Sequence, residues 1–149
     1  MSDRTCLALD FGERRIGVAV GQTVLGTAEG IATVAVRNHK PDWEHLSKLI
    51  RTWRPGTLVV GLPLHLDASE SEMAAAARRF GHQLKQRYDC PVVFVDERLT
   101  SQAANALIKA NGTKHRRGIG YRDRLAARLI LQTYFDREVG RGSDAKGSE

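Results

Sequence analysis

The stretch CLALDFGERRIGVAVG, residues 6–21, decides the fold of this chain. Two apolar runs, residues 6–9 and 16–20, flank the charged, glycine-bearing turn 12–15, and this pattern predicts a β-hairpin. The first strand is apolar on both faces, which is typical of a strand covered by helices on both sides. It ends in Asp10, and a buried carboxylate is costly unless it is paired or binds a metal. Asp10 is therefore either a ligand in a site or an aspartate that merely starts the turn.

The remaining segments alternate between strand and helix patterns. Residues 24–36 extend the hairpin into a third, bent strand, because glycines interrupt a run rich in Thr and Val. Apolar residues at helical spacing then alternate with short apolar runs. The predicted elements are a helix over 41–53, a strand over 57–60, a helix capped by Ser69 that runs to about Tyr88, a strand over 91–95, a helix to about Ala110 and a last helix over 121–138. This order predicts an α/β fold with a mixed five-stranded sheet, made of an antiparallel three-stranded meander plus two parallel strands, and helices on both faces.

A chain of 149 residues is long enough for one domain with a sizeable core. We expect a single domain over residues 1–138, because the apolar pattern of the last helix ends there. Residues 139–149 consist mainly of glycine, serine and charged residues, which predicts a disordered C-terminal tail.

Composition narrows the class of partner. A net charge of +6 and an isoelectric point near 9.7 favour an anionic partner, with nucleic acid the leading candidate. The alternative is that the basic charge only aids solubility. Cys6 and Cys90 lie in or beside predicted buried strands and indicate neither a disulfide framework nor a zinc site. We see no signal peptide and no apolar run of transmembrane length, so we expect a cytoplasmic protein that binds no membrane.

Three acidic residues, far apart in the sequence, are expected to meet. Asp10 and Glu97 each follow an apolar strand, and the carboxyl ends of these strands should lie at one rim of the sheet. Asp123 begins the last helix, which can pack against that rim. Such a site suits phosphodiester hydrolysis with two divalent cations about 3.5–4 Å apart. Oxygen ligands favour Mg²⁺ or Mn²⁺, and carboxylates packed this closely should have a raised pKa.

A basic loop, NGTKHRRGIG at residues 111–120, precedes the last helix. It carries Lys114, His115, Arg116 and Arg117 with no apolar pattern that would bury them. We expect this loop to be mobile and to grip a phosphate backbone on which it orders. The alternative is a solvated connector.

The motifs, taken together, resemble those of the YqgF family, also called RuvX. They are Leu9-Asp10-Phe11-Gly12, residues 15–21, Val60-Gly61-Leu62-Pro63 with Asp67, residues 96–101, and Asp123 in an Ala-rich helix. Members of this family are described as Holliday junction resolvases or pre-16S ribosomal RNA nucleases with an RNase H-like fold, and the resemblance covers the chain up to its tail. It implies that Asp10, Glu97 and Asp123 are the metal-binding catalytic acids.

The same resemblance assigns supporting roles and reveals two departures. Asp67 is a possible fourth acid. Arg98 and Thr100 would contact the metal ligands without binding the metal themselves. Ala68 stands where the family usually has glycine, which bears on the role of Asp67. Arg124 stands where a small residue commonly follows the aspartate, so it is a candidate ion-pair partner of Asp123.

Three classes of function remain open at this point. The family implies a metal-dependent nuclease for 5′-end processing of pre-16S rRNA in ribosome biogenesis, with Holliday junction resolution in DNA recombination and repair as the alternative. A monomer suffices for trimming a strand, whereas a junction resolvase needs a homodimer. The second class is a nucleic-acid-binding factor without catalysis, acting in transcription or ribosome assembly. The third is a phosphotransfer domain that binds ATP. Against it, a single short domain lacks the second lobe that is needed to enclose a nucleotide.

Overall fold

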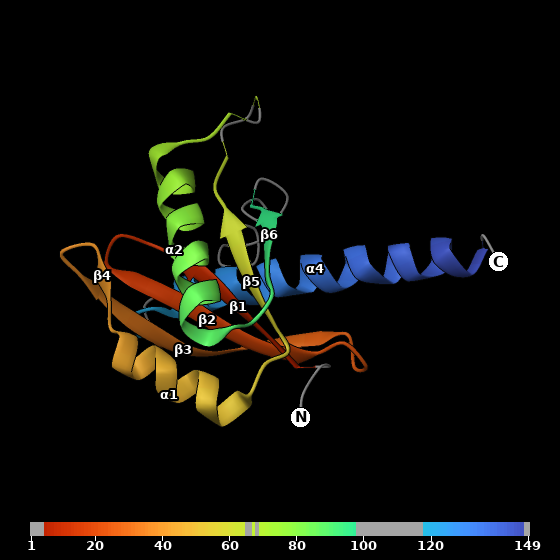
Figure 1. The fold of residues 1–149 in the computed structure, drawn as a ribbon, viewed down its shortest axis with the longest axis horizontal. Coiled ribbons are helices and arrows are strands. Elements are labelled where there is room, and N and C mark those ends of the chain that lie inside the picture. The colour runs from red at the N-terminus through yellow and green to blue at the C-terminus, as the bar shows by residue number, and fades with distance from the viewer. Residues whose placement is uncertain (1–4, 65–66, 68, 98–117, 148–149) are drawn as a thin grey trace.

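The computed structural model describes residues 5–64, 67, 69–97 and 118–147, and the side chains of residues 139–147 are outside that description. Within these ranges one mixed sheet lies between helical layers (Figure 1). The expected α/β architecture is therefore confirmed. The helix expected before Ala110 lies outside the described residues.

The sheet has the strand order β4-β3-β2-β1-β5-β6 among the described residues. The strands are β1 Thr5–Phe11, β2 Arg15–Gln22, β3 Thr27–Arg37, β4 Lys40–Pro41, β5 Thr57–Leu62 and β6 Val92–Asp96. β1 is antiparallel to β2 and parallel to β5, and β5 is parallel to β6. The prediction of five strands missed the two-residue β4, which pairs with the last residues of β3. β4 could not be predicted because two residues are too few to show a strand period.

The helices are α1 Trp43–Trp53, α2 Glu72–Tyr88 and α4 Tyr121–Gly147. α1 begins at a true cap, since the Asp42 side chain accepts a hydrogen bond from the His45 N–H. α2 is capped by Ser71, which accepts from the Ala74 N–H, so the prediction of Ser69 as the cap was wrong. α4 continues beyond the expected end at residue 138. The division into a domain of 1–138 and a tail of 139–149 stays a prediction.

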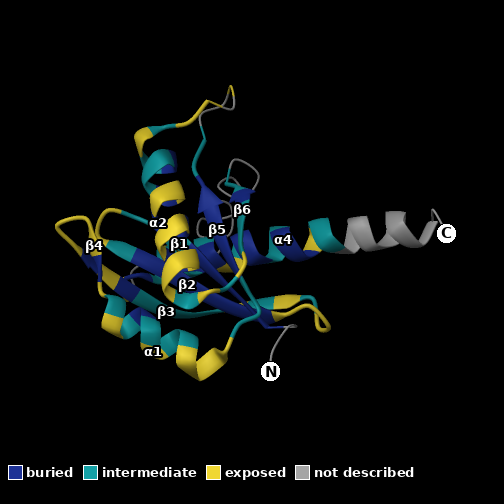
Figure 2. Cartoon of the chain, in the orientation of Figure 1, coloured by how far each residue is buried: buried dark blue, intermediate teal, exposed yellow. Residues whose placement is uncertain are grey.

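The two faces of the sheet are covered by different helices. α1 and α2 pack on one face and α4 on the other (Figure 1), and the strands between them are buried (Figure 2). Because side chains alternate along a strand, each strand contributes one set of residues to each face. Residues packed in the α1/α2 core include Leu7, Leu9, Ile16, Val18, Val20, Leu58 and Val60. Those in the α4 core include Cys6, Ala8, Ala19, Val59, Ala127 and Ile130.

Cys6 and Cys90 are both free. Burial raises the pKa of the Cys6 thiol to about 11, with smaller contributions from Cys90 and Glu138. Such a thiol is an unreactive core residue at neutral pH. No helix in the described ranges is both long and apolar enough to cross a membrane.

Candidate metal-binding carboxylate site

Asp10 is the last but one residue of β1 and lies half-buried on the α4 face of the sheet. It follows Cys6 and Ala8 on that face, because residues two apart in a strand point the same way. Directly opposite, in β2, lies Gly17. The central strand β1 therefore places the Asp10 carboxyl group between the sheet and α4. Gly17 beside it has no side chain that would fill this space.

Glu97 directly follows β6, which is separated from β1 by β5, and its side chain reaches Asp10 across β5. Its backbone N–H donates to the Leu62 carbonyl at 2.9 Å, which fixes the chain as it leaves β6. The carboxyl groups of Asp10 and Glu97 share a hydrogen bond. Gly61, on the intervening strand, makes room for this approach, since an added Cβ there would lie 2.7 Å from Glu97 Cγ. The expected meeting of Asp10 and Glu97 is thus found, across a glycine.

Asp123 lies in the first turn of α4. Its Oδ2 accepts a hydrogen bond from Arg15 Nε at 2.9 Å, in a half-exposed ion pair that joins the start of β2 to the helix. The backbone of this turn sits directly on Gly17, because a Cβ added to Gly17 would collide with the Asp123 carbonyl oxygen. Asp10 and Asp123 are therefore neighbours on either side of one glycine.

The cation found at Asp123 is Arg15, a residue that the sequence did not single out. The expected candidate, Arg124, instead has its Nη1 donating to Thr33 Oγ1 at 3.0 Å and to the Ile119 carbonyl at 3.3 Å. Its backbone packs on Gly30 of β3, where an added Cβ would lie 2.9 Å from Arg124 Cβ. The ion pair of Arg15 spans 108 residues of sequence, and no local pattern could have indicated it.

Burial dominates the electrostatics of the carboxyl pair. It raises the pKa of Asp10 well above its usual range, and the charge of Glu97, the shared hydrogen bond and the charge of Asp123 raise it further. Burial also raises the pKa of Glu97, opposed by the hydrogen bond with Asp10 and assisted by Asp96. A hydrogen bond between two carboxyl groups needs a proton on one of them. The pair therefore keeps a proton at a pH where isolated carboxyl groups have lost theirs.

The pair suits a divalent cation by its donor chemistry. A cation in place of the shared proton relieves the repulsion of two buried carboxylates, and hard oxygen ligands are those that Mg²⁺ and Mn²⁺ prefer. Within the described residues, however, no group of three or more His, Cys, Asp or Glu side chains is close enough to hold one metal ion. The structure thus brings Asp10 and Glu97 into contact, and leaves Asp123 beside them in its ion pair with Arg15.

Asp67 lies exposed in the loop between β5 and α2. Its Oδ1 accepts hydrogen bonds from the Ser69 N–H at 2.9 Å and the Ser69 hydroxyl at 2.6 Å. These bonds form a local turn that shapes the loop. A further role of Asp67 as a fourth acid stays a prediction.

Six other predicted site residues lie outside the described residues. They are Arg98, Thr100, Lys114, His115, Arg116 and Arg117. Their roles beside the metal ligands and on the nucleic acid stay predictions.

Comparison with solved structures defines the class of fold. The chain is similar to Thermus thermophilus RuvC in complex with a Holliday junction substrate, with a TM-score of 0.53 and 17% identity over 91% of this chain and 96% of that one. It is also similar to the yeast mitochondrial Holliday junction resolvase Ydc2, with a TM-score of 0.50 and 7% identity over 90% of this chain and 78% of that one. At these identities the likeness concerns the fold, which is the RNase H fold of RuvC-like proteins.

Comparison of sequences gives the family. The family model described as "RuvX: Holliday junction resolvase" matches residues 4–137, and the chain belongs to the RuvX family. A protein of Marinobacter nauticus named "Putative pre-16S rRNA nuclease" is 45% identical, over 93% of this chain and 96% of its own. Proteins of the same name from Dechloromonas aromatica and Yersinia pestis are 43% and 39% identical, over 89% and 94% of this chain and 90% and 100% of their own. The resemblance predicted from the motifs is confirmed.

Proposed function

We propose that this protein is a metal-dependent nuclease that hydrolyses phosphodiester bonds and processes the 5′ end of pre-16S rRNA in ribosome biogenesis. The observation that carries the proposal is the buried pair of Asp10 and Glu97 at the carboxyl ends of β1 and β6. A protein keeps two repelling carboxyl groups in a dry site at a cost in stability, and such sites are typical of catalysis. The names of the relatives supply the substrate class.

In this proposal the chain's own residues have distinct tasks. Asp10 and Glu97 bind Mg²⁺ or Mn²⁺ once their shared proton has left, and Asp123 is the third acid. Arg15 orients the Asp123 carboxylate and balances its charge while the site holds no cation. The cations activate water and stabilise the leaving oxygen when bound. The basic loop with Lys114, His115, Arg116 and Arg117 binds the phosphate backbone of the substrate.

The test is cleavage by the wild-type protein and by Asp10→Asn and Glu97→Gln variants. The substrates are pre-16S rRNA 5′ ends, single strands and four-way DNA junctions, each with Mg²⁺, Mn²⁺ or EDTA. Both variants should lose more activity than the about 10- to 100-fold typical of losing an outer partner of a metal ligand. The matched control is Glu44→Gln, an exposed carboxylate on α1, which should cleave like the wild type. Full cleavage by Asp10→Asn would refute the assignment.

Two alternatives are decided by the same panel. The description of the matched family as a Holliday junction resolvase favours a DNA substrate, and cleavage of junctions without cleavage of rRNA ends would assign it. That outcome also predicts a homodimer, whereas strand trimming needs only a monomer, and sedimentation separates the two. Binding that persists in EDTA without any product would identify a non-catalytic binding protein.

A further inference from the structure

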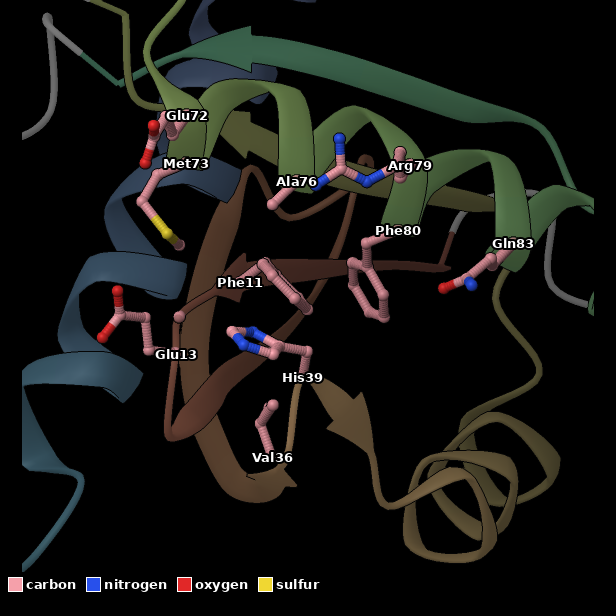
Figure 3. Close-up of a pocket in the computed structure, with 11 residues that line it drawn as sticks. Phe11, Glu13, Val36, His39, Glu72, Met73, Ala76, Arg79, Phe80 and Gln83 are labelled. Atoms are coloured by element: carbon pink, nitrogen blue, oxygen red, sulfur yellow. The ribbon is translucent and has the colours of Figure 1, made fainter.

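A cavity of about 320 Å³ opens on the opposite side of the sheet from the carboxyl pair, at the same edge. It lies between the turn that follows β1, the turn that joins β3 to β4, and α2 (Figure 3). Phe11, which lines it, comes directly after Asp10, and consecutive Cα atoms are about 3.8 Å apart. Because neighbouring residues of a strand point to opposite faces, one strand end serves both the carboxyl pair and the cavity.

The cavity combines an aromatic wall with a polar rim. The rings of Phe11 and Phe80 lie with centroids 4.9 Å apart, and the Phe11 ring is partly exposed. The side chains of His39, Arg79 and Gln83 are exposed and line the same space (Figure 3). Across the described ranges, none of these three polar side chains makes a hydrogen bond or an ion pair. They are therefore available to a ligand.

His39 lies in a tight turn whose backbone conformation favours glycine. Asn38 and His39 have φ values of 52° and 63°, the left-handed region required at both central positions of a tight hairpin turn. Glycine adopts this conformation most readily, and histidine adopts it less readily than glycine. The turn is paired by Arg37 and Lys40 on either side, which fixes the backbone from which the imidazole projects.

We propose that this cavity binds one unpaired nucleobase of the strand whose phosphate reaches the Asp10–Glu97 pair, an inference that rests on the proposed function. Unpaired bases bind proteins by stacking on aromatic rings and by hydrogen bonds at their edges. Phe11 and His39 offer the rings, Gln83 offers both donor and acceptor, and Arg79 offers a partner for the adjoining phosphate. A volume near the low end of the range for small-molecule sites, about 300–1,000 Å³, suits one nucleotide rather than a peptide segment.

Two acidic residues of the cavity indicate which nucleobases it prefers. Glu13 and Glu72 also line the cavity (Figure 3). A carboxylate accepts hydrogen bonds from exocyclic amino groups, as of cytosine N4. The cavity therefore prefers a base with such a group, adenine, cytosine or guanine, over uracil or thymine.

The test measures binding of fluorescein-labelled 12-nucleotide single strands, RNA and DNA in separate arms, in EDTA so that no cleavage intervenes. Each strand is compared with copies that carry one abasic site, placed in turn at each position. His39→Gly removes the imidazole and suits a positive φ, so the variant should keep its fold. Its matched control is Asn38→Gly, the neighbouring residue, which does not line the cavity. Arg79→Gln is matched by Lys85→Gln, an exposed residue of the same helix outside the cavity.

Base stacking predicts that His39→Gly weakens binding of the intact strand about 5- to 150-fold. One abasic position should weaken wild-type binding similarly, and at that position His39→Gly should cause no further loss. Arg79→Gln should weaken all strands, and both controls should bind like the wild type. Equal binding by wild type and His39→Gly, or an equal loss on intact and abasic strands, would overturn the proposal.

The outcomes for the cavity and for the nuclease are separate. Cleavage that depends on Asp10, with no effect of His39→Gly on binding, would overturn the nucleobase site and leave the nuclease. Base-dependent binding through His39 without cleavage under Mg²⁺ or Mn²⁺ would support the nucleobase site and refute the nuclease. The arm with the tighter base-dependent binding identifies RNA or DNA as the strand.

Discussion

The two faces of the central sheet are built from residues of different size. Strands β1 and β2 present Leu7, Leu9, Ile16, Val18 and Val20 to α1 and α2. To α4 the same strands present Cys6, Ala8, Asp10, Gly17, Ala19 and Gly21. Large side chains keep helices at a distance filled by hydrocarbon, whereas small ones let a helix backbone approach closely. The face that lacks bulk is the one that holds the carboxyl groups.

The close approach has a direct consequence for the acids. The first turn of α4 rests on Gly17 and Gly30, and Glu97 lies over Gly61. A side chain at Gly17 would push Asp123 away from Asp10, and one at Gly61 would push Glu97 away. A side chain at Gly30 would displace Arg124, the residue after Asp123. On the α1/α2 face, large apolar side chains of the strands stabilise the fold by their burial. On the α4 face the same strands bury less apolar area, and the space is used to assemble the site.

The largest expected effect comes from adding one methyl group to the small-residue face. Gly17→Ala should lower the free energy of unfolding by about 3 kcal/mol or more, because the new Cβ meets the rigid backbone carbonyl of Asp123. The matched variant is Ile16→Val, which removes one methyl from the adjacent, fully buried residue on the other face. It should cost about 0.5–1.5 kcal/mol. Urea unfolding measures both, and a smaller loss for Gly17→Ala than for Ile16→Val would contradict the difference between the faces.

A second, intermediate effect concerns pH. Because the pKa of Asp10 is higher in the folded protein than in the unfolded chain, the folded state binds the proton more tightly. The stabilisation is present below about pH 4 and is lost as the pH rises through the raised folded pKa. Without metal, Asp10→Asn should therefore become more stable than the wild type as the pH rises from about 4 to 8. Each unit by which the pKa is raised contributes about 1.4 kcal/mol to this difference.

The measurement is urea unfolding of both proteins across this pH range in EDTA. Adding Mn²⁺ at pH 8 should stabilise the wild type and leave Asp10→Asn unchanged, since only the wild type retains both carboxylates. Stability curves that run parallel with pH would show that the carboxyl pair is not strained in the folded protein.

The smallest expected effect is that of the ion pair between Arg15 and Asp123. Both side chains are partly exposed, with relative exposures of 41% and 27%, so solvent screens the attraction. A double-mutant cycle with Arg15→Gln and Asp123→Asn should give a coupling of about 0.5–1 kcal/mol that shrinks in high salt. A coupling near zero at low salt would mean that docking of α4 on glycine alone positions Asp123.

Prediction from the sequence succeeded where the signal is local. The uninterrupted apolar run of residues 6–9 indicated a strand covered on both faces, and the later apolar patterns indicated the order of strands and helices. It failed where several nearby residues compete, as with Ser69 and Ser71 for the cap of α2, because both have the hydroxyl that a cap needs. It also failed for β4, whose pairing depends on the turn at Asn38 and His39 rather than on any period.

The sequence alone determined the α/β class, the family and the acids at the ends of strands, because strand period and motif are written in residues close together. Only the tertiary structure decided that Asp10 meets Glu97 across Gly61, that Arg15 rather than a neighbour in sequence holds Asp123, and that Phe11, His39 and Arg79 line one cavity. These contacts depend on which strands lie side by side and how closely a helix can approach them. Both are set by packing over the whole sheet, so no short stretch of the chain carries them.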